Sequence, residues 1–182
     1  MIKTANRIAN VEEYYFSRKL AEVRSLDTPD FRVINLGIGS PDQTPSTATI
    51  DALITSAKNP SHHGYQNYKG IPQLRKGIAD FYQRIYQVSL DPESMILPLM
   101  GSKEGIMHIA MAFVNEGDEV LIPDPGYPTY SSVATLVGAT LRPYALREDM
   151  NWGIDIEALR ASDLSKVKIM WVNFPHMPTG RV

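Results

Sequence analysis

Residues 95–113 read MILPLMGSKEGIMHIAMAF, and they join two apolar stretches of different period through a short polar corner. The first stretch, taken from residue 94 to residue 100, is typical of a short buried strand. The second repeats its apolar side chains at the three- and four-residue spacing of a helix packed on a sheet. The change of period at Gly101 therefore predicts a sharp turn from a strand into a helix.

The same alternation continues to the end of the sequence. Strands are expected over residues 119–122, 139–146 and 168–174, and helices over residues 127–137 and 155–161. Strands that alternate with helices predict a three-layer α/β/α fold around a mainly parallel sheet. Such sheets bind ligands beyond the carboxyl ends of their strands, and the glycine corner lies at one of these ends.

Three further helices are predicted in the first half of the chain. The first is amphipathic, with apolar positions that include Ile8 and Val11, and it ends near Ser25. The second follows Ser46 and Thr47, both plausible N-caps. The third spans residues 71–88 and has a proline near its first turn, where proline is well tolerated.

Composition narrows the classes of function. The chain has 182 residues, 43% of them hydrophobic, which is enough for one sizeable core. Lysine and arginine total 18 against 20 acidic residues, without a run of like charge, so neither nucleic acid nor a membrane is expected as a partner. The sequence has no cysteine and no apolar run of about eighteen residues. We therefore expect a soluble cytoplasmic protein without disulfides.

The corner at Gly101 has the chemistry of an anion site. The amides of Ser102, Lys103 and Glu104 would be unpaired in the first turn of the helix, and the helix dipole favours negative charge there. These amides and the Ser102 hydroxyl would bind a phosphate. The alternative is that Ser102 only caps the helix and that Lys103 points into water.

Other phosphate and metal motifs do not fit the sequence. A P-loop requires Gly-Lys-Ser/Thr, whereas the order here is Gly-Ser-Lys. The segment GIGSPD has Asp42 where the third glycine of the dinucleotide fingerprint would stand. No metal site is expected, because no histidine has a partner at a ligand spacing.

Five segments of the sequence carry a family resemblance. They are NLGIGSPDQTP, YQNYKGIPQLRKGIADFY, GSKEGI, DEVLIPDPGYPTY and NFPHMPTG, in this order. Together they resemble the class I and II aminotransferases, the pyridoxal-phosphate enzymes of fold type I, and most of all the branch of the LL-diaminopimelate and aspartate aminotransferases. The resemblance covers nearly the whole chain but only the first half of such an enzyme. It implies small-domain elements in residues 1–45 and the first part of the large, cofactor-binding domain in residues 46–182.

The resemblance also implies roles for single residues. Gly101, Ser102 and Lys103 would bind the phosphate of pyridoxal 5'-phosphate, with the glycine allowing close approach of the backbone. Tyr127 would stack on the pyridine ring of the cofactor. Without the resemblance, Tyr127 is equally well explained as an aromatic residue in a Gly-Tyr-Pro turn.

Two further roles follow from the same comparison with the family. Tyr65 is implied to reach from one subunit to the phosphate in the other, which predicts a homodimer. The alternative is that Tyr65 or Tyr68 is a packed loop aromatic. Gly39 is implied to offer its amide to the carboxylate of the substrate, and the alternative is a turn that requires positive φ.

One position departs from the family pattern. The family usually has Asn-Pro-x-Asn-Pro-Thr-Gly, and its second asparagine donates a hydrogen bond to the phenolic oxygen of the cofactor. Met177 occupies that position here, and its thioether cannot donate. Either His176 or another group substitutes, or the oxygen has one donor fewer. Asn173 matches the first asparagine, whose role we take as structural.

The resemblance leaves the catalytic residues outside this sequence. In the family, the Schiff-base lysine, the acidic partner of the pyridine nitrogen and the arginine for the α-carboxylate all lie beyond the Pro-Thr-Gly segment. We therefore nominate no catalytic residue and expect the 182-residue chain alone to be inactive. The whole protein is predicted to be an aminotransferase of amino-acid biosynthesis, acting on an amino acid and a 2-oxo acid. A lyase or decarboxylase of the same fold and a non-catalytic fragment are the alternatives.

Overall fold

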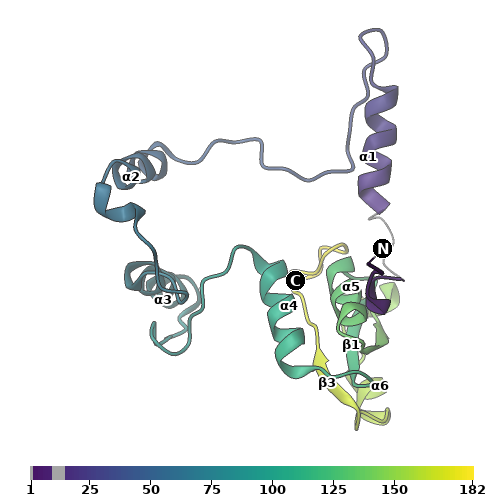
Figure 1. The fold of residues 1–182 in the computed structure, drawn as a ribbon. Coiled ribbons are helices and arrows are strands. Elements are labelled where there is room, and N and C mark those ends of the chain that lie inside the picture. Colours follow the sequence, from purple (N-terminus) through teal and green to yellow (C-terminus); the bar gives the residue numbers. More distant parts are fainter. Residues whose placement is uncertain (1, 10–14) are drawn as a thin grey trace. The chain divides into compact units, whose positions relative to one another are not determined.

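A computed structural model of the protein describes residues 2–9 and 15–182 (Figure 1). These residues form two compact units, which we call the sheet unit, residues 2–9 and 99–182, and the helical unit, residues 15–98. The domain division that the sequence predicts between residues 45 and 46 rests on the family resemblance and stays a prediction.

The sheet unit is built around three parallel strands. They are β1 (Glu119–Asp124), β2 (Thr140–Ala145) and β3 (Val167–Met170), and their order in the sheet is β2-β1-β3. β1 pairs with β2 along its full length. The predicted parallel sheet is therefore confirmed, with β1 at its centre.

The last strand is shorter than the sequence predicts. The pairing of β1 with β3 stops where Leu121 meets Met170, and the amide of Trp171 then donates to the Leu121 carbonyl over 2.9 Å. Beyond this point β1 pairs only with β2. Residues 171–174, which were predicted to continue the strand, leave the sheet at its carboxyl end.

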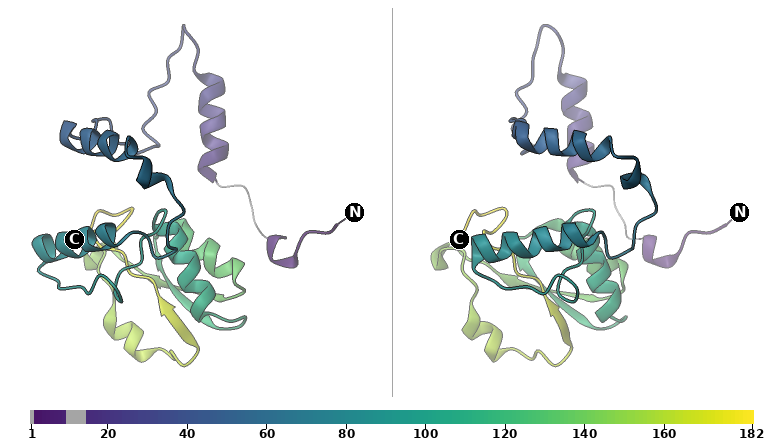
Figure 2. Two further views of the ribbon diagram at one scale, coloured as in Figure 1. Left: turned by 60° about the vertical axis from the view of Figure 1, so that its left-hand side comes forward. Right: turned by 90° about the vertical axis from the view of Figure 1, so that its left-hand side faces the viewer.

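Helices cover both faces of this sheet, as Figures 1 and 2 show. α4 (Ser102–Phe113) and α5 (Pro128–Leu136) pack on one face, where their buried side chains form a core with β1. α6 (Ile156–Ala161) brings Leu159 against buried residues of β1 and β2 on the other face. The three predicted helices of this region and the three-layer arrangement are confirmed.

The predicted strand over residues 94–100 is wrong. This segment has no regular structure, and it crosses the division between the two units. None of its apolar residues is buried, and the exposure reaches 61% for Met95 and 93% for Met100. A strand needs a neighbour for its backbone hydrogen bonds, and none of the three described strands pairs with these residues. The apolar pattern alone could not reveal that the neighbour was missing.

The helical unit contains three α-helices, α1 (Tyr15–Leu26), α2 (Thr47–Ala57) and α3 (Pro72–Tyr86). The Ser46 hydroxyl accepts from the Thr49 amide, which confirms Ser46 as the cap of α2, whereas Thr47 is the first residue of the helix. A 3₁₀ turn, η2 (Pro60–His63), follows α2. The first predicted helix is confirmed from residue 15 onward.

The start of the first predicted helix differs from the structure observed there. Ile8 lies in a short 3₁₀ turn, η1 (Asn6–Ile8), which contacts α5 in the sheet unit. Val11 lies outside the described residues.

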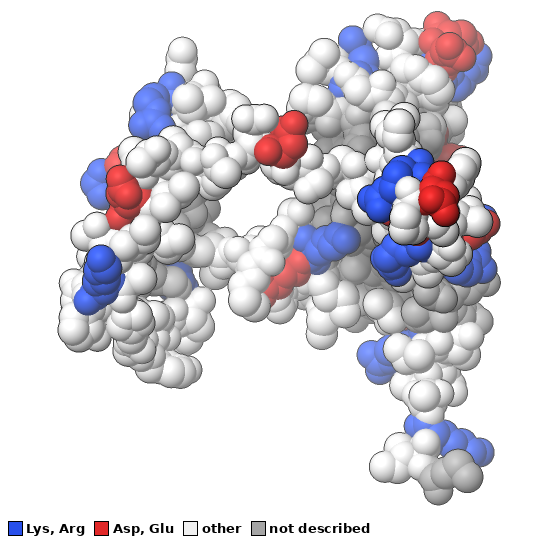
Figure 3. Space-filling view, turned by 90° about the horizontal axis from the view of Figure 1, so that it is seen from above, with Lys and Arg blue, Asp and Glu red and all other residues white. Residues whose placement is uncertain are grey.

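Charges of both signs are mixed on the face of the molecule seen in Figure 3, where Lys and Arg lie among Asp and Glu. This distribution agrees with the formal net charge of −2. None of the described helices is long and apolar enough to cross a bilayer.

Arg75 joins α3 to the chain on either side of it. Its guanidinium donates to the carbonyls of Gly70 over 2.6 Å and of Pro92 over 2.9 Å, and to the Glu93 carboxylate over 2.7 Å. The Arg75 side chain is only 5% exposed, whereas the Glu93 side chain is 66% exposed. The hydrogen bonds to the two carbonyls, rather than the ion pair with the partly solvated Glu93 carboxylate, therefore account for most of the stability that Arg75 contributes.

Replacing Arg75 should destabilise the helical unit. We expect Arg75→Ala to lower the free energy of unfolding by about 2 kcal/mol, because a buried charged donor and its hydrogen bonds to the carbonyls of Gly70 and Pro92 are lost. Urea unfolding followed by circular dichroism measures the change. The matched control is Arg84→Ala, which removes an exposed arginine from the same helix. Equal stability of the two variants would contradict the role given to Arg75.

A second prediction concerns Tyr144, whose hydroxyl donates to the Trp171 carbonyl over 2.6 Å. Burial raises the pKa of Tyr144 from 10.0 to about 12. Because the folded state holds this proton more tightly, the stability it contributes is complete below about pH 10 and falls as the pH rises toward about 12. Tyr144→Phe should remove this part of the alkaline destabilisation and cost about 1 kcal/mol at neutral pH.

Denaturant unfolding at about pH 8 and about pH 11 measures both effects of Tyr144→Phe. Tyr68→Phe is the matched control, since the Tyr68 side chain is 91% exposed. If Tyr144→Phe loses as much stability at alkaline pH as the unmodified chain, then Tyr144 is not the titrating group.

Candidate functional site

The predicted turn lies at Gly101, immediately before α4. Gly101 is the N-cap of this helix, with φ 111° and ψ 155°. This φ belongs to the left-handed region that favours glycine. A Cβ atom at residue 101 would meet nothing within 4 Å, so the backbone conformation, and not a lack of space, calls for glycine.

Ser102 does not cap α4, so the alternative explanation of this serine is wrong. It is the first residue of the helix, and no described side chain caps the helix at Gly101. Glu104 instead reaches back, and its carboxylate accepts from the Met100 amide over 2.6 Å. This bond, together with one to His108, lowers the pKa of Glu104. Within the described residues, the start of α4 thus has no side-chain cap at Gly101, as an anion site requires.

A cavity of about 450 Å³ opens beside this turn. Its volume is within the range of small-molecule sites. The lining residues come from α4, from α5 and the turn before it, and from the chain after β3, and they are Ser102, Ile106, Tyr127, Tyr130, Trp171, Val172, Asn173, Pro175 and Met177. The cavity is therefore at the carboxyl end of the sheet, where the α/β pattern predicted a ligand.

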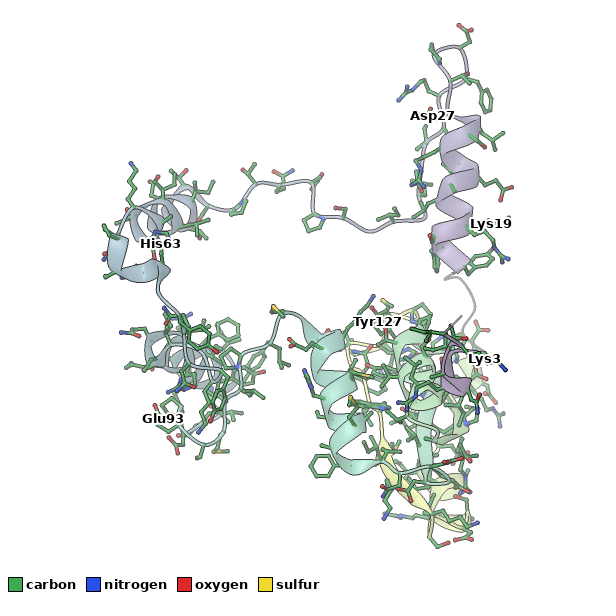
Figure 4. All side chains as sticks on the ribbon, viewed as in Figure 1. Lys3, Lys19, Asp27, His63, Glu93 and Tyr127 are labelled. Carbon is green, nitrogen blue, oxygen red and sulfur yellow. The ribbon has the colours of Figure 1, made fainter. Side chains whose placement is uncertain are left out.

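Tyr127 forms one aromatic wall of the cavity. It precedes α5 and is half-buried, and Figure 4 shows it at the end of the sheet unit where α4 begins. Its ring meets Tyr130 edge to face at 5.9 Å, and Tyr130 stacks on Trp171 at 5.3 Å with an interplanar angle of 13°. The three rings make a continuous, rigid surface, of which the sequence analysis identified only Tyr127.

The turn that presents Tyr127 depends on a glycine that the sequence analysis did not single out. A Cβ atom on Gly126 would lie 2.2 Å from the Pro123 carbonyl oxygen and 3.0 Å from its carbon. These are backbone atoms of β1, which cannot move aside without breaking the end of the strand. Gly126 is therefore required for close packing of the chain, although it does not line the cavity.

Lys103 lies over the ring of Tyr127, with 5.6 Å between its Nζ atom and the ring centroid. The nearby Thr129 hydroxyl and, after it, the Lys103 ammonium lower the pKa of the Tyr127 phenol. The alternative that Lys103 merely points into water is therefore wrong. Of the predicted site residues, the structure brings Gly101, Ser102, Lys103 and Tyr127 together.

The segment after β3 forms the far wall of the cavity. The Asn173 carboxamide accepts from the Met177 amide over 3.2 Å, which agrees with a structural role for this asparagine. His176 is 3% exposed, and its Nδ1 atom lies 2.8 Å from the Thr179 hydroxyl. Within the described part of the chain its Nε2 atom is buried without a partner. His176 does not line the cavity, whereas Met177 does.

Tyr65 and Gly39 belong to the helical unit. Tyr65 and Tyr68 are 104% and 91% exposed, so the alternative of a packed loop aromatic is wrong for both. Gly39 is also exposed, and it is not among the glycines with positive φ, which contradicts the alternative of a strained turn. The subunit and substrate contacts inferred for these two residues stay predictions.

Aromatic residues near the ends of the predicted strands and helices were the sequence signal that could have added further residues to the predicted site. Trp171 follows the last strand, and Tyr130 stands one helical turn after Tyr127. The sequence pattern places both in a strand or a helix but gives neither a role, because it does not say which elements are neighbours.

Comparisons with known proteins agree with this arrangement. A family model described as "Aminotransferase class I and II" matches residues 32–182. The LL-diaminopimelate aminotransferase of Dehalococcoides mccartyi is 39% identical over 184 residues, which take in 100% of this chain and 47% of that protein. The enzyme of the same name from Halothermothrix orenii is 36% identical, over 100% of this chain and 46% of that protein.

A solved structure of BacF from Bacillus subtilis has the same fold. Its TM-score with this chain is 0.89 at 34% identity, and the match covers 98% of this chain and 46% of that one. The chain thus spans about half the length of the relatives it matches. From the matched residues and the shared fold, we conclude that this chain belongs to the class I and II aminotransferase family.

Proposed function

We propose that the whole protein is a pyridoxal-phosphate-dependent aminotransferase that moves an amino group between an amino acid and a 2-oxo acid. One observation carries this proposal: the uncapped start of α4 and the Tyr127 ring border the same cavity. The first is suited to a phosphate and the second to a flat heteroaromatic ring. Pyridoxal 5'-phosphate joins these two chemical groups in one molecule.

The residues present fit this cofactor in charge as well as in size. The helix amides and the Ser102 hydroxyl favour a dianionic group. The described residues that line the cavity include no carboxylate that would repel it. The aromatic surface of Tyr127, Tyr130 and Trp171 supplies an apolar environment for the ring. When bound, pyridoxal 5'-phosphate would supply a conjugated system that accepts electrons from the α-carbon of the substrate.

The proposed role of this chain's residues is to bind the cofactor and to orient its ring. Ser102 would hold one end of the cofactor, and Tyr127 would fix the plane of its ring. Met177 would present a thioether rather than an amide to the ligand, so the phenolic oxygen would receive no hydrogen bond from this side chain. We assign proton transfer to no residue of this chain and propose that the 182 residues alone are inactive.

Membership of the family also suggests a metabolic role, a cellular compartment and an oligomeric state for the whole protein. We propose a role in amino-acid biosynthesis in the cytoplasm, in line with the diaminopimelate aminotransferases among the relatives. We also propose a homodimer in which Tyr65 of one subunit reaches the phosphate site of the other. The full exposure of Tyr65 supports this assignment, because the ring is free to enter a partner's site.

Cofactor binding can be measured on this chain without any activity. Equilibrium dialysis with pyridoxal 5'-phosphate should detect binding that inorganic phosphate competes away. Ser102→Ala should weaken binding roughly tenfold or more, because a hydrogen bond to a charged group is lost. The matched control is Ser165→Ala, which removes an exposed hydroxyl that does not line the cavity. Equal affinity of Ser102→Ala and the unmodified chain would contradict the phosphate site.

The reaction itself is tested on the whole protein as the cell produces it. Amino donors are screened with 2-oxoglutarate, and the expected products are glutamate and the 2-oxo acid of the donor. Release of ammonia without an acceptor would instead indicate a lyase. Tyr65→Phe should weaken cofactor binding in the dimer but leave it unchanged in this chain if the chain is monomeric.

A further inference from the structure

Lys103 occupies a position that helix stability does not explain. It is the second residue of α4, at the positive end of the helix dipole, where a cation is unfavourable. Glu104, the next residue, carries the charge that this end of the helix favours. A lysine at this position therefore calls for an interaction outside its own helix.

The partner of Lys103 is a ring that borders the cavity. Its Nζ atom is 5.6 Å from the centroid of Tyr127, within the range of a cation–π contact. Tyr127 lines the cavity but Lys103 does not. The ring follows the tight turn at Gly126 in the chain, and it also meets Tyr130 edge to face. Lys103 thus adds a contact from α4 to those that hold this ring.

We propose that Lys103 is a positioning residue, which fixes the Tyr127 ring at the cavity and acts on a bound ligand through that ring. The functional part of this inference rests on the proposed cofactor. It changes the assignment of the GSKEGI corner, because the phosphate would be held by the Ser102 hydroxyl and the helix amides, while the lysine serves the aromatic wall. The contact between Lys103 and Tyr127 can be tested separately from cofactor binding.

The electrostatics at the phenol agree with this contact. The groups that lower the pKa of Tyr127 are the Thr129 hydroxyl and the Lys103 ammonium. The other titratable neighbour is Tyr130, whose own pKa is raised, mainly by burial and also by Tyr127. Lys103 is therefore the charged group whose removal should be visible in the titration of Tyr127.

The first test is an NMR titration of the chain labelled with ¹³Cζ-tyrosine, in which Tyr127→Phe assigns the signal. In Lys103→Met the pKa of Tyr127 should rise, whereas Lys103→Arg should keep it lowered, because arginine retains the charge and stacks on aromatic rings. Lys168→Met is the control for loss of an exposed lysine in the same unit. Circular dichroism verifies that each variant is folded. An unchanged Tyr127 titration in Lys103→Met would overturn the proposal.

The second test separates a positioning role from direct phosphate binding. Lys103→Met should weaken the binding of pyridoxal 5'-phosphate roughly two- to fivefold, and this loss should disappear in a Tyr127→Ala background. A loss that persists in that background, or an equal loss in the binding of inorganic phosphate, would overturn the positioning role. Absence of any binding to the unmodified chain would overturn the proposed function, while the NMR titration would still decide the contact between Lys103 and Tyr127.

Discussion

Trp171 ties together the end of the sheet on which the candidate site depends. Its amide donates to Leu121 in β1, its carbonyl accepts from the Tyr144 hydroxyl of β2, and its ring stacks on Tyr130 of α5. One residue thus connects two strands and a helix at the point where β3 ends. Because these contacts use its amide, carbonyl and ring at once, the position of the cavity wall follows from the pairing of the sheet itself.

The parts of the fold that depend on local pattern were predictable from the sequence. Strand and helix periods gave the parallel sheet and its two covering layers, and the change of period at Gly101 gave the turn. The segment around residues 94–100 was mispredicted because an apolar run becomes a strand only beside a partner. Arg75 was missed for a related reason, since three of its acceptors are carbonyls that only the folded chain brings together.

In the candidate site, too, the features that depend on local sequence were predictable, whereas those that depend on contacts between distant elements were not. The anion-binding character of the turn after Gly101 could be inferred from the sequence, because the first amides of any α-helix have no acceptor within the helix. The family resemblance added Tyr127, which the structure brings to the same cavity as Ser102. Neither source predicted Trp171 as a wall of that cavity or Gly126 as the residue that shapes the turn. Those roles come from contacts between elements distant in the sequence.

The order of the strands has a consequence for solubility. β2 and β3 are the outer strands of the described sheet, so each has one side without a neighbouring strand. β2 contains Pro143, which has no amide hydrogen to offer, and β3 has only four residues, one of them Lys168. Short, charged or proline-containing edges discourage strands of other molecules from adding to a sheet. Pro143 and the short β3 with Lys168 are therefore features that oppose edge-to-edge pairing of the described sheet.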